Sequence, residues 1–147
     1  MTIPRCHSDR PPRVLIVDDE YTVRTVLSAA LRRQGFDTRL AAGGAEAVAL
    51  LRHEGAFDLA LIDLRMPGMD GLATAAALTQ VSPRLRCCLL TGGEAPSEED
   101  LRAAGIACIL SKPVSTETLS RGLTKCLSGD KPTTALRREE GRLQPSD

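Results

Sequence analysis

The chain has 147 residues, enough for one domain with a proper core and too few for two comfortable ones. Lysine and arginine together number 19, as do aspartate and glutamate, so the formal net charge is zero. This balance gives no overall sign of nucleic-acid or anionic-membrane binding. With one tyrosine, two phenylalanines and no tryptophan, the chain lacks aromatic platforms for stacking bases, and its core must consist of Leu, Val, Ile and Ala.

The five cysteines are an odd number and show no C-x-x-C spacing, which disfavours a disulfide framework or a zinc site. Three lie within apolar runs and are expected to be small buried hydrophobic residues: Cys87, Cys88 and Cys108. Cys126 falls on an expected helix and Cys6 in the N-terminal arm. No leader pattern and no apolar stretch of spanning length appears. We therefore expect a cytoplasmic protein in a reducing compartment, without a membrane partner.

Five apolar runs of strand length alternate with five segments of helical periodicity. The expected strands are residues 14–17, 36–41, 59–62, 85–90 and 106–110. The expected helices begin near residues 21, 44, 72, 98 and 115, and the first and fourth end at Gly35 and Gly105. This alternation predicts an α/β fold, a doubly wound five-stranded parallel sheet of flavodoxin-like order 2-1-3-4-5. Asp37 and Arg39 alternate with apolar residues, which places the second strand at an edge.

The domain is expected to span residues 13–127. Residues 1–12 are rich in proline and are expected to form a flexible arm. Residues 128–147 are charged, contain proline and show no apolar period, which predicts a disordered tail rather than an output domain.

Four of the expected strands end in polar side chains, and a parallel sheet brings these ends to one edge. The residues are Asp18 and Asp19, then Asp63, then Thr91, then Lys112. Clustered carboxylates repel one another unless a cation joins them, and an all-oxygen set suits Mg²⁺, for which Mn²⁺ can substitute. Lys112 and the Thr91 hydroxyl would complete a site for a transferred phosphoryl group, with Asp63 as the nucleophile. Each residue alone could be a cap, a turn residue or a surface charge, but the ordered set favours the functional interpretation.

With these motifs in order, the sequence resembles the receiver domain of two-component response regulators over residues 13–127. The matching pieces are Val17-Asp18-Asp19-Glu20, the run from Asp63 to Gly71, Leu90-Thr91-Gly92 and Ser111-Lys112-Pro113. The resemblance implies that Asp63 is the phosphoacceptor of a sensor histidine kinase or a histidine phosphotransfer protein.

The resemblance also implies the roles of the residues around the acceptor. Asp19, Asp63 and the backbone carbonyl of Arg65 should bind Mg²⁺ directly, and Asp18 should act through water. Thr91 and Lys112 should contact the phosphoryl oxygens. The bond between Lys112 and Pro113 is cis in many relatives, which would aim the lysine inward.

The sequence departs from the family pattern at the switch. Ile109 stands where many members carry an inward-rotating Tyr or Phe, and Val114 replaces the aromatic residue that usually follows Lys-Pro. We expect Ile109 and Pro113 to belong to a switch and partner surface that works without aromatic gating. This surface would comprise residues 91–97 and the last two helices with the strand between them. Arg65 is either a solvated loop residue or a group that overhangs the phosphoryl and changes the access of water.

These features predict a stand-alone receiver that acts on an unidentified protein target or serves as a phosphate relay, with a homodimer as one option. It would be no enzyme beyond catalysing its own phosphorylation and dephosphorylation. Two alternatives remain: a phosphorylation-independent interaction module, and an aspartyl-phosphate phosphohydrolase. The phosphohydrolases usually carry Asp-x-Asp after the first strand, whereas Tyr21 follows Asp18-Asp19-Glu20 here. The absence of G-x-G-x-x-G and of a helix-turn-helix disfavours dinucleotide and nucleic-acid binding.

Overall fold

The computed structural model describes residues 10–128 and 137–139. The strands are β1 (Arg13–Val17), β2 (Asp37–Ala41), β3 (Leu59–Asp63), β4 (Arg86–Thr91), β5 (Ile106–Ser111) and β6 (Arg137–Glu139). The helices are α1 (Tyr21–Arg33), α2 (Gly44–Glu54), α3 (Gly71–Val81), α4 (Glu98–Ala103) and α5 (Thr116–Leu127). Strands β1 to β5 pair in parallel in the order β2-β1-β3-β4-β5, which confirms the predicted fold.

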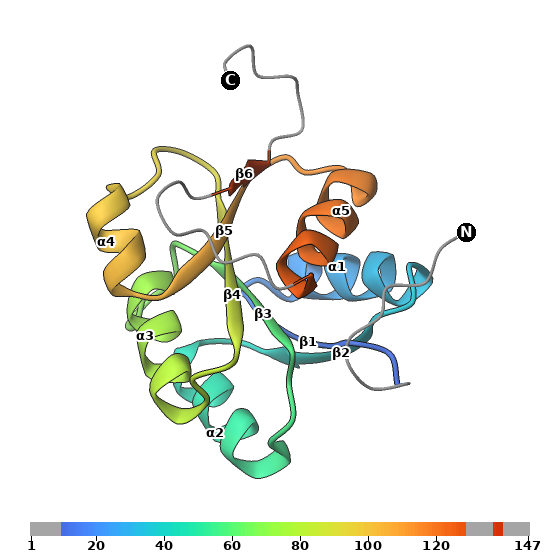
Figure 1. The fold of residues 1–147 in the computed structure, drawn as a ribbon, viewed down its shortest axis with the longest axis horizontal. Helices are drawn as coiled ribbons and strands as arrows, with labels where there is room; N and C mark the ends of the chain where they lie inside the picture. The colour runs from blue at the N-terminus through green and yellow to red at the C-terminus, as the bar shows by residue number, and fades with distance from the viewer. Residues whose placement is uncertain (1–9, 129–136, 140–147) are drawn as a thin grey trace.

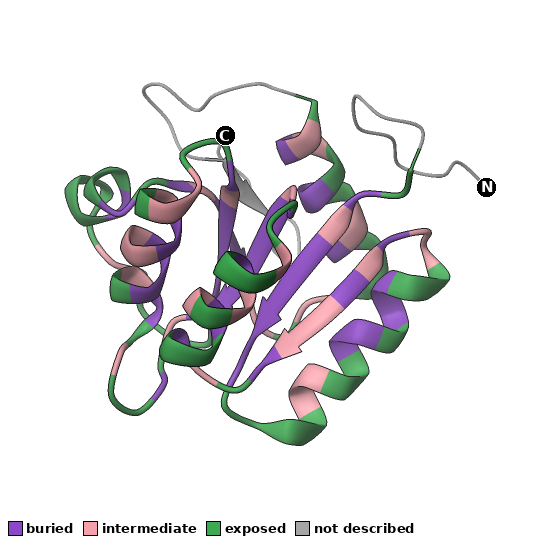
Figure 2. Ribbon diagram, turned by 90° about the horizontal axis from the view of Figure 1, so that it is seen from below, coloured by how far each residue is buried: buried purple, intermediate pink, exposed green. Residues whose placement is uncertain are grey.

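Helices cover both faces of the sheet, with α2, α3 and α4 on one face and α1 and α5 on the other (Figure 1). Successive strand residues point to opposite faces, so each strand feeds two cores. In β1, Leu15 and Val17 pack beneath α2 to α4, whereas Val14 and Ile16 pack beneath α1 and α5. The central strands are therefore buried on both sides (Figure 2), and this burial explains why their sequences are continuous apolar runs.

The two edges of the sheet differ from its centre. Strand β2 lies at one edge, as its alternating polar residues predict, and its Arg39 forms an ion pair with Glu54 at 3.2 Å. At the other edge, β6 pairs in parallel with β5. This short strand lies inside the segment predicted to be a tail, and the sequence predicted no strand there because its residues, Arg-Arg-Glu, have no apolar period. The remaining tail residues, and residues 1–9 with Cys6, lie outside the described residues.

Local signals set the helix starts close to the carboxyl edge of the sheet. Side chains cap three helices: Asp70 accepts from the backbone N–H of Ala73, Ser97 from Asp100 and Ser115 from Thr118, at 2.9, 3.1 and 3.0 Å. These caps define where α3, α4 and α5 leave the loops that follow β3, β4 and β5. Within the described residues, no helix has the length and apolar character needed to cross a membrane.

Candidate functional site

The residues that end or directly follow β1, β3 and β5 line one cavity at the carboxyl edge of the sheet. The cavity has a volume of about 450 Å³ and is lined by Asp18, Asp19, Glu20, Asp63, Arg65, Gly92, Gly93 and Lys112. Strands β1 and β3 are neighbours, with Val17 beside Ile62, so the next residues, Asp18 and Asp63, emerge side by side. Parallel pairing alone therefore brings together carboxylates that are 45 positions apart in the sequence.

Three carboxylates crowd together in this cavity. Oxygen atoms of Asp18, Asp19 and Asp63 all lie within 4.8 Å of one another. Asp18 is 2% exposed; its Oδ1 accepts a hydrogen bond from the Glu20 N–H at 2.9 Å. Its Oδ2 is buried and has no hydrogen-bond partner among the described residues. Burial and the charges of Asp63 and Asp19 raise the pKa of Asp18, against the lowering effects of the Glu20 hydrogen bond and of Lys112. A cation would stabilise this buried oxygen.

Lys112 provides a fixed positive charge beside Asp63. Its Nζ donates to Asp63 Oδ1 at 2.8 Å and lies 4.0 Å from Asp18 Oδ2. Burial alone would lower the pKa of Lys112, but the hydrogen bond to Asp63 and the charges of Asp63, Asp18 and Glu20 outweigh burial and raise it. The lysine is therefore a cation at neutral pH. The backbone is fixed at this position because the Lys112 N–H donates to the Thr91 carbonyl at 2.7 Å. The Lys112–Pro113 bond is cis.

The loops after β3 and β4 form the walls of the cavity. Gly71 lets the start of α3 pass close to the acidic strand end, since a Cβ there would lie 2.6 Å from the Asp63 carbonyl oxygen. Arg65 lines the cavity and its guanidinium approaches the loop after β4, where a Cβ on Gly93 would lie 3.8 Å from a guanidinium nitrogen. Arg65 is thus positioned at the cavity, not directed away from it.

Two predicted residues have buried side chains: Thr91, expected to contact the phosphoryl group, and Ile109, expected in the switch surface. Thr91 ends β4 but is 2% exposed and does not line the cavity wall. Ile109 is 1% exposed and packs in the core beneath α2 to α4, so it contributes no surface in this structure. Burial stabilises an aliphatic side chain, which is the physical reason for the inward position of Ile109. Pro113, by contrast, is exposed.

No role was predicted for three of the residues that line the cavity: Glu20, Gly92 and Gly93. Glu20 directly follows the acidic pair, and its charge contributes to the raised pKa of Lys112. Its position after two strand-end carboxylates is the signal that could have identified it. The two glycines follow Thr91 and leave the mouth of the cavity open, because they carry no side chain.

Comparison with known proteins identifies the class of this fold and site. Residues 14–124 match the family described as the response regulator receiver domain. The chemotaxis protein CheY4 of Vibrio cholerae is similar in structure, with a TM-score of 0.74 and 31% identity over 79% of this chain and 98% of that one. This chain belongs to the response regulator receiver family.

Two similar proteins differ in how much of their own length this chain covers. The transcriptional regulatory protein ZraR of Salmonella typhimurium is 34% identical over 123 residues, which are 83% of this chain and 28% of that protein. Sporulation initiation phosphotransferase F of Bacillus subtilis is 28% identical over 116 residues, 78% of this chain and 93% of that protein. The chain therefore spans less than a third of ZraR but nearly all of the phosphotransferase.

Proposed function

We propose that Asp63 of this receiver accepts a phosphoryl group from the phosphohistidine of a sensor kinase or a histidine phosphotransfer protein. The observation that carries the proposal is the pairing of the Asp63 carboxylate with the Lys112 ammonium at 2.8 Å, inside a cavity that also holds the buried Asp18. Asp63 is 8% exposed, so its carboxylate is held in a defined orientation at the cavity wall. Positioning and charge stabilisation supply most of the catalysis of phosphoryl transfer.

The donor set fits a divalent cation, and receiver domains generally bind Mg²⁺. Asp18 Oδ2 is buried without a hydrogen-bond partner among the described residues, and three carboxylates supply oxygen atoms within 4.8 Å of one another. Hard oxygen ligands favour Mg²⁺, with Mn²⁺ as a substitute. Asp18, Asp19, Asp63 and the backbone carbonyl of Arg65 would hold the ion. When bound, it would neutralise charge on the phosphoryl oxygens.

The protein's own groups account for the rest of the reaction. A carboxylate oxygen of Asp63 attacks the phosphorus, the P–N bond to the donor histidine breaks, and the histidine ring keeps the electron pair and gains a proton. The Lys112 ammonium then passes from the Asp63 carboxylate to a phosphoryl oxygen, which is a stronger anionic partner. Thr91 reaches the same group with its hydroxyl after the loop that follows β4 moves inward. Loss of the Lys112–Asp63 ion pair and inward movement of this loop couple phosphorylation to α4.

Intact-mass spectrometry with acetyl phosphate tests this function. The wild type should gain one phosphoryl group only when Mg²⁺ is present, and Asp63→Asn should gain none. The matched control is Asp37→Asn, which removes a carboxylate at the amino end of β2, the opposite edge of the sheet, and should label like the wild type. Labelling of Asp63→Asn would show that another residue is the acceptor, and absence of labelling in the wild type would favour a phosphorylation-independent interaction module.

The output should pass through the loop after β4 and the face made by α4, β5 and α5, without an aromatic switch. Because Ile109 fills the position of the usual aromatic residue and is buried, phosphorylation should shift its methyl resonances by changing the packing around it, not by moving it through the surface. NMR spectra of the phosphorylated protein in which Ile109 and α4 are unchanged would contradict this route.

Arg65 should affect the lifetime of the phosphoryl group. Its guanidinium lies at the cavity, where it can pair with a phosphoryl oxygen and alter the access of water. The variant Arg65→Ala should change the dephosphorylation rate while still labelling at Asp63. An unchanged rate would leave Arg65 as a solvated loop residue.

Residues 13–127 act as the receiver unit in the cytoplasm, as a signalling protein whose only chemistry is its own phosphorylation and dephosphorylation. The downstream partner is a protein that recognises the phosphorylated state, and a relay role or a homodimer uses the same surfaces. Small phosphate esters should not be turned over, which separates this function from that of a phosphohydrolase.

A further inference from the structure

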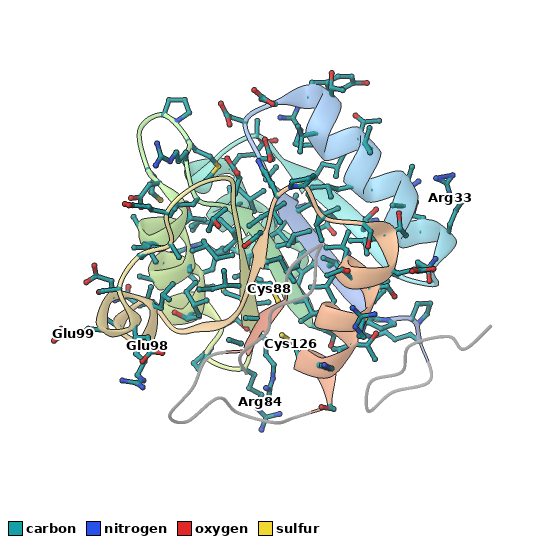
Figure 3. All side chains as sticks on the ribbon, turned by 90° about the horizontal axis from the view of Figure 1, so that it is seen from above. Arg33, Arg84, Cys88, Glu98, Glu99 and Cys126 are labelled. Carbon is teal, nitrogen blue, oxygen red and sulfur yellow. The ribbon has the colours of Figure 1, made fainter. Side chains whose placement is uncertain are left out.

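Three thiols from three different elements meet beneath α5. They belong to Cys88 of β4, Cys108 of β5 and Cys126 of α5, and their Sγ atoms all lie within 4.8 Å of one another. The Sγ atoms of Cys88 and Cys126 are 3.3 Å apart (Figure 3). Register places Cys88 beside Cys108 on adjacent strands, and the buried face of α5 brings Cys126 over them. This group lies away from the carboxylate cavity and has no role in the proposed phosphorylation.

The surroundings favour a neutral product over a metal–thiolate centre. The cysteines belong to a core cluster whose other members are aliphatic or aromatic, among them Leu90, Leu110 and Leu123. Three thiolates around Zn²⁺ or Cu⁺ would leave net negative charge there, and zinc would lack its usual fourth ligand. Hydrogen bonding to Cys108 and Cys126, together with burial, raises the pKa of the Cys88 thiol well above its ordinary value, so forming all three thiolates is unfavourable. A disulfide carries no charge and uses two sulfurs.

We propose that Cys88 and Cys126 are a peroxide-sensitive pair that closes to a reversible disulfide and ties α5 to β4. The sulfurs must approach from 3.3 Å to the bonded distance of about 2.05 Å, a shift within the reach of side-chain rotation and a small adjustment of the helix. Cys108 is the less suitable partner, because its link to Cys88 would join two strands already fixed by their ladder.

The chemistry begins at Cys126 because it is the more accessible sulfur. Cys126 is 5% exposed and is the last residue but one of α5, whereas Cys88 is fully buried. Helix ends open more readily than the core, so fraying of this turn admits the oxidant. The Cys126 thiolate attacks a peroxide oxygen, the O–O bond breaks, and a sulfenic acid and one water result. Cys88 sulfur then attacks the sulfenic sulfur, and a second water leaves. Two electrons pass from the sulfurs to the peroxide, and both thiol protons end in water.

The disulfide should restrain the helix that forms part of the proposed output face. A link between residues 38 positions apart restricts the unfolded chain strongly, so the oxidised protein should melt about 5–10 °C higher than the reduced one. Amide exchange in the last turns of α5 should slow at the same time. The inference does not depend on phosphorylation of Asp63, because neither thiol contacts the cavity.

The test is oxidation of the full, reduced chain with hydrogen peroxide, followed by intact-mass measurement and a non-reducing peptide map. We expect the loss of two hydrogen atoms per chain, a Cys88–Cys126 linkage and full reversal by a thiol reductant. The map is best made in Cys87→Ala, because Cys87 and Cys88 otherwise share a tryptic peptide. Cys87 is equally buried but packs on the opposite face of the sheet, so Cys87→Ala is also the matched control and should retain the linkage.

Further variants identify which two cysteines form the disulfide. Cys108→Ala should form the linkage, whereas Cys126→Ala should not, and the map in Cys87→Ala assigns the pair even where another variant folds poorly. A linkage through Cys108 or Cys6 would overturn the proposal, as would sulfinic acid without any linkage. Uptake of one Zn²⁺ or Cu⁺ per chain by the reduced protein, lost in Cys126→Ala, would also overturn it, because the cluster would then be a metal site.

Discussion

Replacing Asp18 with asparagine should stabilise the protein in the absence of divalent cations and weaken it relative to the wild type in their presence. Asp18 is 2% exposed, and one of its carboxylate oxygens has no hydrogen-bond partner among the described residues. An asparagine keeps the shape and the oxygen that accepts from Glu20, and it directs an N–H₂ donor toward the neighbouring carboxylates. The substitution therefore removes a buried charge without leaving a cavity.

The magnitude follows from two distances and the burial of Asp18. At an effective dielectric constant of about 20, two like charges at 4.8 Å, the upper limit on the distance between the nearest Asp18 and Asp63 oxygens, repel by about 3.5 kcal/mol. The attraction of Asp18 to Lys112 Nζ at 4.0 Å is about 4 kcal/mol on the same basis, so these two terms nearly cancel. The cost of the unsatisfied buried oxygen remains, about 1–3 kcal/mol. Asp18→Asn should be more stable than the wild type by about this amount.

Urea unfolding with EDTA and with Mg²⁺ measures both halves of the prediction. A cation at 100 times its dissociation constant stabilises the folded wild type by about 2.7 kcal/mol, whereas the variant has lost one of three carboxylates and should gain far less. The order of stability should therefore reverse when Mg²⁺ replaces EDTA. The control is Glu99→Gln in the exposed first turn of α4, away from the cavity, which should stay within about 0.5 kcal/mol of the wild type in both buffers. Equal or lower stability of Asp18→Asn in EDTA would refute the reasoning.

Three further predictions use the same unfolding measurement. Without cations, the wild type should approach Asp18→Asn in stability as the pH falls. The pKa of Asp18 is higher in the folded than in the unfolded protein, where it is 3.8, so its protonation stabilises the fold fully below pH 3.8 and this stabilisation is lost as the pH rises through the folded pKa. A constant difference between the two proteins from pH 7 to pH 4 would contradict this. Lys112→Met should destabilise the protein by about 1–3 kcal/mol and raise the pKa of Asp18 further, because the ammonium that balances two buried carboxylates is lost; an unchanged urea midpoint would contradict it. Gly71→Ala should cost more than about 1 kcal/mol and reduce acetyl phosphate labelling, because its Cβ would meet the Asp63 carbonyl oxygen at 2.6 Å; normal labelling would show that the loop adjusts freely.

The sequence predicted the elements of the fold because their signals are local. Apolar runs and helical spacing are properties of short windows, and the expected boundaries agree with the five main strands and five helices to within about two residues. The edge position of β2 followed from the alternation at Asp37 and Arg39. Strand β6 carries no such signal, since its residues are polar and its pairing depends on the free edge of β5.

The polar residues at the strand ends were also predictable, although their individual positions were not. Parallel pairing guarantees that Asp18 and Asp63 share an edge of the sheet. Whether a side chain then faces the cavity depends on packing, which turns Lys112 inward and leaves Thr91 and Ile109 buried. The family resemblance named the roles of these residues, but the exposed fraction of each depends on its neighbours in space.

Contacts between residues that are far apart in the sequence could be known only from the tertiary structure. The Lys112–Asp63 ion pair joins positions 49 apart, and the Cys88–Cys126 contact joins positions 38 apart. Their positions in apolar runs predicted that three of the cysteines are buried, but not which of them share one face of the sheet. That depends on strand register and on the rotation of α5 about its axis, because a single-residue change in either would turn a side chain to the other side.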